Sequence, residues 1–234
     1  MGQKASPISL RLPITKDWSS RWFSEKKMSD FIAEDDLIKS LIIKKIGFQG
    51  GINKVVINRS AQEIKIIINT SKPGIIIGRS GQGVNDLKKL ISNKIMSFRQ
   101  KTNQIKTWKI KNYSKPKITL DKIDIKVNEI REPETYANLV AQNIASQIEK
   151  RVAYRRAIKQ AITKSSANKK VLGIKVSVSG RLDGVEIARN EKFGIGSIPL
   201  SKFKKTIDYA KQTANTTYGA VGIKVWIYKQ EISE

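Results

Sequence analysis

Hydrophobic residues in the first half of the chain recur with two periods. From Ser29 to Ile46 they repeat every three or four positions, which predicts an amphipathic helix ending before Gly47. Two strand-like runs follow at 54–59 and 63–69, joined by a link of hairpin length. A short apolar turn then leads to a helix spanning 84–98, and a strand is expected at 122–131. The predicted order is helix, strand, strand, short helix, helix, strand.

The second half changes from a helical to a strand pattern. From Pro133 to about Thr163 the chain carries no further helix breaker, but its hydrophobic stripe turns by more than a quarter-turn. We therefore expect a break near 150–153 that separates two helices. Strand-like runs punctuated by glycines follow at 171–179, 181–189, 205–213 and 222–229. This half is predicted to be an α+β domain with a mostly antiparallel sheet.

Two segments show no regular period. Residues 1–28 are basic with interleaved aromatic residues, which predicts an N-terminal arm that orders on a partner. Residues 99 to about 120 are polar and rich in lysine, and they are interpreted as an insertion before the last strand of the first domain. The expected domains are therefore an arm (1–28), a first α+β domain (29–132, containing that insertion) and a C-terminal α+β domain (133–234).

Charge narrows the range of functions. Among 234 residues, 45 Lys and Arg stand against 20 Asp and Glu, a net charge of +25. Such a charge calls for a polyanionic partner, and nucleic acid is favoured over an anionic membrane or an acidic protein. The chain has no Cys and no His, which excludes a Cys or His metal site, a His base and a Cys nucleophile. Its apolar runs are too short to span a bilayer, and its start lacks an export signal, so we expect the compartment of synthesis.

A glycine loop, Gly78-Arg79-Ser80-Gly81, precedes the predicted helix at 84–98. The chain lacks the Gly-Lys-Ser/Thr ending of a Walker A loop and the third glycine of a dinucleotide fingerprint. In this order of elements the loop resembles that of a type II KH module, in which the GXXG loop clamps four backbone nucleotides. The expected RNA-binding residues here are Lys72, Gly78, Arg79, Ser80 and Gly81.

The second helix of the C-terminal half carries unbalanced positive charge. Arg151, Arg155, Arg156 and Lys159 spread over an arc of roughly 140°, opposite the apolar stripe. No acidic residue follows Glu149 in this stretch to neutralise them through i,i+4 pairing. A solvated helix face is the alternative, but the single sign of charge favours contact with RNA phosphates.

Longer motifs resemble the bacterial-type small-subunit ribosomal protein S-three family (the universal uS3 family). They lie at 1–7, 14–23, 72–81, 154–159, 180–189 and 216–227, and the last two are highly specific. The resemblance implies a non-enzymatic protein of the small-subunit head, bound to rRNA beside ribosomal proteins S-ten and S-fourteen. It also implies that the basic helix, with Arg151, Arg155, Arg156 and Lys159, lines the channel through which mRNA enters and helps to unwind mRNA hairpins.

The further expectations follow from this resemblance and from the basic segments. The rRNA-binding candidates are Lys4, Arg11, Lys16, Arg21, Arg181 and Arg189. No cofactor, metal, membrane or small-molecule substrate is expected. A cytoplasmic ribosome is expected, with an organelle-encoded ribosome as the alternative. Two other classes stay open at this stage: a KH-type regulator acting off the ribosome, and a nuclease or lyase that uses carboxylates and a metal.

Overall fold

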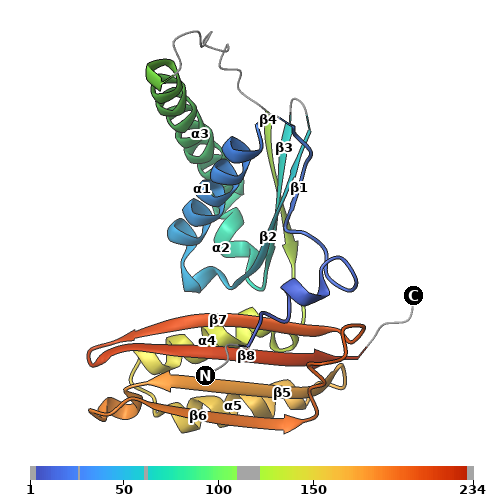
Figure 1. Ribbon diagram of the computed structural model, residues 1–234. Coiled ribbons are helices and arrows are strands. Elements are labelled where there is room, and N and C mark those ends of the chain that lie inside the picture. Colours follow the sequence, from blue (N-terminus) through green and yellow to red (C-terminus); the bar gives the residue numbers. More distant parts are fainter. Residues whose placement is uncertain (1–3, 26, 61–62, 110–121, 231–234) are drawn as a thin grey trace. The chain divides into compact units, whose positions relative to one another are not determined.

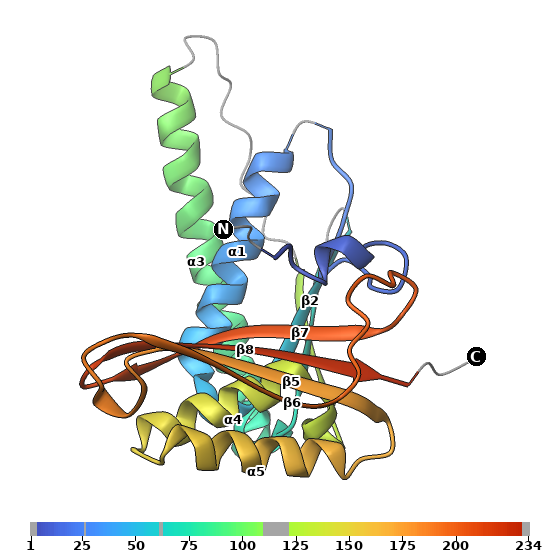
Figure 2. The same cartoon turned by 60° about the horizontal axis from the view of Figure 1, so that its bottom comes forward.

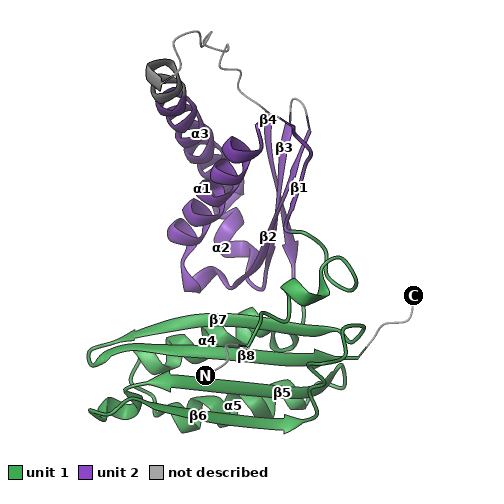
Figure 3. Ribbon diagram, viewed as in Figure 1, with its two compact units in different colours: residues 1–18, 131–234 green, residues 19–130 purple. Residues whose placement is uncertain are grey.

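The computed structural model describes residues 4–25, 27–60, 63–109 and 122–230, with only the backbone at 103–109. The chain divides into two compact units, one of residues 1–18 and 131–234 and the other of residues 19–130 (Figure 3). The structure is a mixture of helices and sheets, so the predicted α+β class is confirmed. Both the first domain and the C-terminal domain hold helices and a sheet of their own.

The unit of residues 19–130 packs helices on one side of a mixed sheet (Figure 1). The sheet order is β1-β2-β3-β4, with β2 and β3 antiparallel and the outer pairs parallel. Isoleucines fill the core, among them Ile38 and Ile42 of α1 against Ile57 and Ile66 of the sheet. In chain order the elements are β1 (Ser20–Arg21), α1 (Met28–Ile46), η2 (Phe48–Gly50), β2 (Ile52–Arg59), β3 (Glu63–Thr70), α2 (Pro73–Ile77), η3 (Arg79–Gly81), α3 (Gln82–Lys109) and β4 (Lys122–Glu129).

The predicted order of elements in this unit is confirmed, with two differences: the short strand β1, which the sequence did not indicate, and the length of α3. The helix continues through 99–109, where the polar composition had suggested an insertion without regular structure. The α3 residues buried in the core are Leu87, Ile91 and Ile95, so the hydrophobic period ends before the helix does. The rest of the expected insertion, 110–121, lies outside the described residues.

The other unit is a two-layer sandwich of two helices and one sheet. The sheet order β6-β5-β8-β7 is antiparallel throughout, as predicted, and α4 and α5 cover one of its faces (Figures 1 and 2). Ile144 and Ile158 of the helices pack against Val176 and Val225 of the sheet. The elements are η1 (Ser9–Arg11), η4 (Pro133–Thr135), α4 (Ala137–Glu149), α5 (Tyr154–Ser166), β5 (Val171–Gly180), η5 (Leu182–Gly184), β6 (Arg189–Gly196), β7 (Ile207–Thr216) and β8 (Gly219–Lys229).

The expected break between the two helices is confirmed, but one predicted strand is wrong. The chain leaves α4 at Glu149 and begins α5 at Tyr154, with Arg151 between them at a left-handed φ of +63°. The run 181–189 is not a strand: it forms η5 and a loop, and β6 starts only at Arg189. Asp183 and Gly184 have φ values of +52° and +84°, far from the extended values of regular strand residues.

The N-terminal residues 4–25 pack on the rest of the chain. Residues 4–18 belong to the C-terminal unit, and β1 pairs in parallel with β2 of the other unit. Arg11 is fully buried, and its guanidinium donates to four main-chain carbonyls. The acceptors are those of Pro7, Leu200, Lys202 and Lys205. The expectation that Arg11 contacts rRNA is therefore wrong, because no part of this side chain reaches the surface.

Candidate RNA-binding surfaces

The glycine loop connects α2 to α3 through a series of left-handed residues. Gly78, Ser80 and Gly81 have φ values of +70°, +51° and +75°. A Cβ at the next glycine, Gly83, would lie 2.6 Å from the carbonyl oxygen of Ile76, so α3 starts directly against α2. This close start leaves the loop outside the core, with the side chains of Arg79 and Ser80 exposed.

The geometry of this loop suits an anion. The amino end of α3, a helix of 28 residues, follows it directly, and helix amino ends attract negative charge. Arg79 adds a full positive charge, and Lys72 lies exposed at the start of α2. The structure thus brings the five expected loop residues to one end of this unit, in a form that a phosphodiester backbone can approach.

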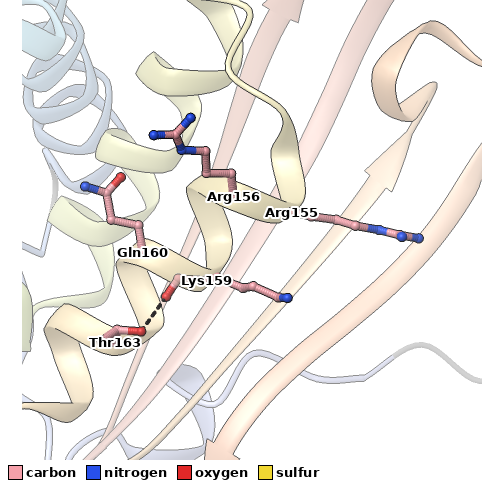
Figure 4. Close-up of a pocket in the computed structure, with 5 residues that line it drawn as sticks. All are labelled: Arg155, Arg156, Lys159, Gln160 and Thr163. Carbon is pink, nitrogen blue, oxygen red and sulfur yellow. Dashed lines mark hydrogen bonds between the residues drawn. The ribbon is translucent and has the colours of Figure 1, made fainter.

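The basic surface of the other unit is built on α5. Tyr154, Ala157, Ile158 and Ala161 are buried against the sheet, which turns the opposite side of the helix outward. A shallow hollow on this outer side is lined by Arg155, Arg156, Lys159, Gln160 and Thr163 (Figure 4). Arg155 and Lys159 extend to one side of the helix axis and Arg156 to the other (Figure 4). Arg151 is exposed too, but it lies in the turn before α5 and not on the helix.

One of these cations has an acidic partner that the sequence did not suggest. Arg155 donates from Nη2 to Oε1 of Glu191 on β6 at 2.9 Å and from Nε to the hydroxyl of Tyr154 at 2.9 Å. Tyr154 and Glu191 thus accept from the same guanidinium. The Arg155 hydrogen bond is the main reason why the pKa of Glu191 falls below its ordinary value, so the carboxylate stays ionised. Within the described part of the chain, Arg156 and Lys159 have no ion pair.

The remaining candidates differ in their surroundings. Lys4 and Arg189 are exposed, and Arg21 is exposed on β1. Lys16 pairs with Asp208 at 3.5 Å. Arg181 lies over the ring of Tyr218 and donates to the carbonyls of Val185 and Tyr218, so it also holds the loop that replaces the predicted strand.

Metal-binding clusters and membrane-spanning helices are both absent from the described residues. No cluster of three or more acidic, Cys or His side chains there has the arrangement to hold a metal ion. None of the helices that the structure describes is long and apolar enough to cross a membrane.

Two family models match successive parts of the chain. A KH domain model matches residues 37–135, and a model of the ribosomal protein S3 C-terminal domain matches residues 144–227. Small ribosomal subunit protein uS3 of Finegoldia magna is 45% identical over 99% of this chain and 85% of its own length. The uS3 proteins of Desulforamulus reducens and Maridesulfovibrio salexigens are 42% and 44% identical over 99% of this chain and 94% and 97% of their own lengths. The chain therefore belongs to the uS3 family of small ribosomal subunit proteins, which are RNA-binding structural components of the ribosome and not enzymes.

Proposed function

We propose that this protein lines the channel through which mRNA enters the small subunit, and that α5 holds the incoming mRNA and helps to open its hairpins. In the same proposal the glycine loop and other basic surfaces contact rRNA of the head, beside ribosomal proteins S-ten and S-fourteen. The three relatives named above are bacterial, which favours a cytoplasmic ribosome over an organelle-encoded one.

The observation that carries this proposal is the outward face of α5. Its apolar stripe is fixed in the core of the unit, so Arg155, Arg156 and Lys159 are presented on a rigid element. Arg156 and Lys159 are exposed and, among the described residues, have no ion pair to satisfy them. Phosphates supply such partners, and contacts to phosphates carry no sequence preference. A surface that binds every mRNA must bind without sequence preference, which phosphate contacts allow.

The arrangement also accounts for unwinding without a nucleotide site. A grip on single-stranded phosphates stabilises the open form of an RNA relative to its hairpin. Movement of the message past the protein then supplies the work. The protein's own residues need only resist re-pairing of the strand, so neither hydrolysis nor a conformational cycle of this chain is required.

The test is translation of matched messages, with and without a stable hairpin, on ribosomes carrying Arg155→Ala, Arg156→Ala and Lys159→Ala together. The fold is expected to survive, because all three side chains are exposed and Ala is the best helix former. We expect slow passage through the hairpin and near-normal reading of the unstructured message. Lys164→Ala, in the last turn of the same helix, is the matched control.

Two outcomes would overturn the proposal. Equal slowing on both messages would show that the three side chains do not act on mRNA structure. Failure of the triple variant to enter subunits, with its fold intact, would show that this face docks on rRNA instead.

A further inference from the structure

The sheet of the C-terminal unit has a second face, opposite the one that α4 and α5 cover (Figure 2). Side chains alternate between the two faces of a strand, so the residues of the second face can be read from the strand register. They lie between the buried positions of each strand, such as Val176 on β5 and Val225 on β8. Neither α4 nor α5 packs on them, and the N-terminal segment of the same unit passes over the end of the face where Ile207 is fully buried.

Neighbouring strands align these residues in rows across the sheet. One row holds Tyr209 of β7, Trp226 of β8 and Lys175 of β5 in direct register. The rings of Tyr209 and Trp226 pack with their centroids 5.3 Å apart. The next row runs across all four strands and consists of Lys211, Lys224, Ser177 and Lys192. The three lysines of this row are exposed.

Lys211 and Lys224 make this second row unusual. They are direct cross-strand partners on strands roughly 4.8 Å apart, and like charges in that position destabilise a sheet. Neither they nor Lys192 form an ion pair with any described acidic side chain. The fold therefore maintains a repulsion on this face that a bound anion would relieve.

Acidic residues of the same strands are sorted to the helix side. Asp208 of β7 accepts the backbone N–H of Ala137 at 3.0 Å and pairs with Lys16. Glu191 of β6 pairs with Arg155 of α5. Among the described residues whose register places them on the open face, none is acidic. The open face thus carries only basic charges, whereas the acidic residues of these strands lie on the helix side.

The open face is also flat beside its lysines. The positions next to the lysine row on β5, β8 and β6 are Ser179, Gly222 and Gly194. A Cβ at Gly194 would lie 2.9 Å from the carbonyl oxygen of Ile174, and one at Gly222 would lie 3.2 Å from the Ser179 hydroxyl. Because Gly194 and Gly222 carry no side chain, a sugar-phosphate backbone can lie close to the sheet at these two places.

We propose that this open face, defined by Lys175, Lys192, Tyr209, Lys211, Lys224 and Trp226, is a docking surface for ribosomal RNA. The lysines neutralise successive phosphates, and the aromatic pair offers a stacking surface for a base or ribose. Its occupant is rRNA and not mRNA because it lies on the other side of the unit from α5. That last clause rests on the proposed function of α5, whereas RNA binding by the face does not.

The first test measures binding of the full chain to a small-subunit rRNA transcript at several salt concentrations. Lys211→Gln with Lys224→Gln is compared with Lys202→Gln and Lys204→Gln, which remove the same charge from the exposed loop before β7. We expect the face variant to lower the steepness of log K against log salt by about 1.4–1.8, the value for two phosphate contacts. Equal loss in both double variants would overturn the proposal, since only net charge would then matter.

The second test uses the assembled small subunit and does not require any variant to fold. Acetylation of Lys211 and Lys224 is measured before and after nuclease digestion. Protection that disappears with the RNA supports the proposal. Protection that survives digestion would assign the face to a protein neighbour, and full reactivity throughout would show that nothing covers it; both results overturn the proposal. Neither depends on the hairpin assay, so failure here leaves the role of α5 intact, and the reverse also holds.

Discussion

Arg155 and Glu191, 36 residues apart in the sequence, are joined by a 2.9 Å ion pair. The same guanidinium also donates to the hydroxyl of Tyr154. The ring of Tyr154 is buried in the core, with the guanidinium 5.6 Å from its centroid. Arg155 is thus positioned and partly neutralised at once. A phosphate that binds Arg155 must compete with Glu191, whereas Arg156 and Lys159 present no such competitor within the described structure.

Removing the negative charge of Glu191 should therefore strengthen RNA binding. Glu191→Gln keeps an oxygen that can accept the Arg155 hydrogen bond and removes only the charge. We expect affinity for single-stranded RNA to rise by about two- to fivefold, because an exposed ion pair is weak. The slope of log K against log salt should steepen by at most about 0.7, the value for one phosphate contact on a single strand. Salt titrations of the isolated protein measure both quantities.

Two controls separate this effect from a change in net charge. Glu134→Gln removes one negative charge from an exposed position of the same unit and should leave affinity nearly unchanged. In an Arg155→Ala background the gain from Glu191→Gln should disappear. Persistence of the gain there would mean that Glu191 acts through the general field and not through Arg155.

Stability of the KH unit should depend on pH through Glu34. This buried carboxylate of α1 accepts hydrogen bonds from Arg59 at 2.6 Å and Arg99 at 2.7 Å. Burial alone would raise the pKa of Glu34, but the hydrogen bonds and charges of Arg99 and Arg59 outweigh it and bring the pKa below the ordinary 4.5. The stabilisation is therefore complete above pH 4.5 and is lost as the pH falls through the lower, folded value.

Glu34→Gln should remove that acid-dependent part of the stability. At neutral pH we expect a loss of about 3 kcal/mol, because one partner of a buried ionic network is removed. Denaturant unfolding at pH 7 and below pH 4.5 measures both effects. Asp36→Asn, an exposed change on the same helix, should alter the unfolding free energy much less. If the free energy of unfolding fell equally with pH in Glu34→Gln and in the unmodified protein, Glu34 would not be the source of the acid dependence.

Arg11 should contribute to stability and not to RNA binding. Its guanidinium joins the N-terminal segment to the loop between β6 and β7 through the carbonyls of Leu200, Lys202 and Lys205. Arg11→Met leaves those carbonyls without their donor, and we expect a loss of about 2–4 kcal/mol. Urea unfolding measures the loss, and faster proteolysis of the 197–206 loop should accompany it. Lys4→Met, at an exposed position, should change neither measurement.

Features that depend on residues close together in the sequence could be predicted, whereas features that depend on contacts between distant segments could not. Helices and strands with an apolar stripe were found from local periods, including the break before Tyr154, because burial of one face imposes the period. The strand expected at 181–189 failed because its alternation was accidental: only Leu182 of η5 is buried there. Left-handed Asp183 and Gly184 bend the chain at that point.

Only part of the candidate RNA-binding surfaces could be predicted, because local sequence patterns do not contain contacts between distant segments. The glycine loop and the α5 cations are contiguous in sequence, so spacing alone indicated them. Burial of Arg11 and pairing of Arg155 with Glu191 depend on contacts between distant segments, which no local pattern contains. The lysine row of the sheet was also missed, since Lys192, Lys211 and Lys224 come together only through strand register.

The glycine loop offers the most direct check on the KH unit. Replacing Arg79 and Ser80 by Asp places two negative charges where a phosphate is expected, while both side chains stay in solvent. The fold should persist because neither side chain packs in the core, and Asp tolerates the left-handed φ of +51° at position 80. RNA crosslinking to peptides around residue 79 should then fall sharply in isolated protein and in assembled subunits.

Asn at both positions, which adds no negative charge, serves as the control and should retain part of the crosslinking. Loss in the isolated protein alone would mean that the loop binds RNA but does not use it in the subunit. Unchanged crosslinking in both settings would leave the loop as a structural corner between α2 and α3.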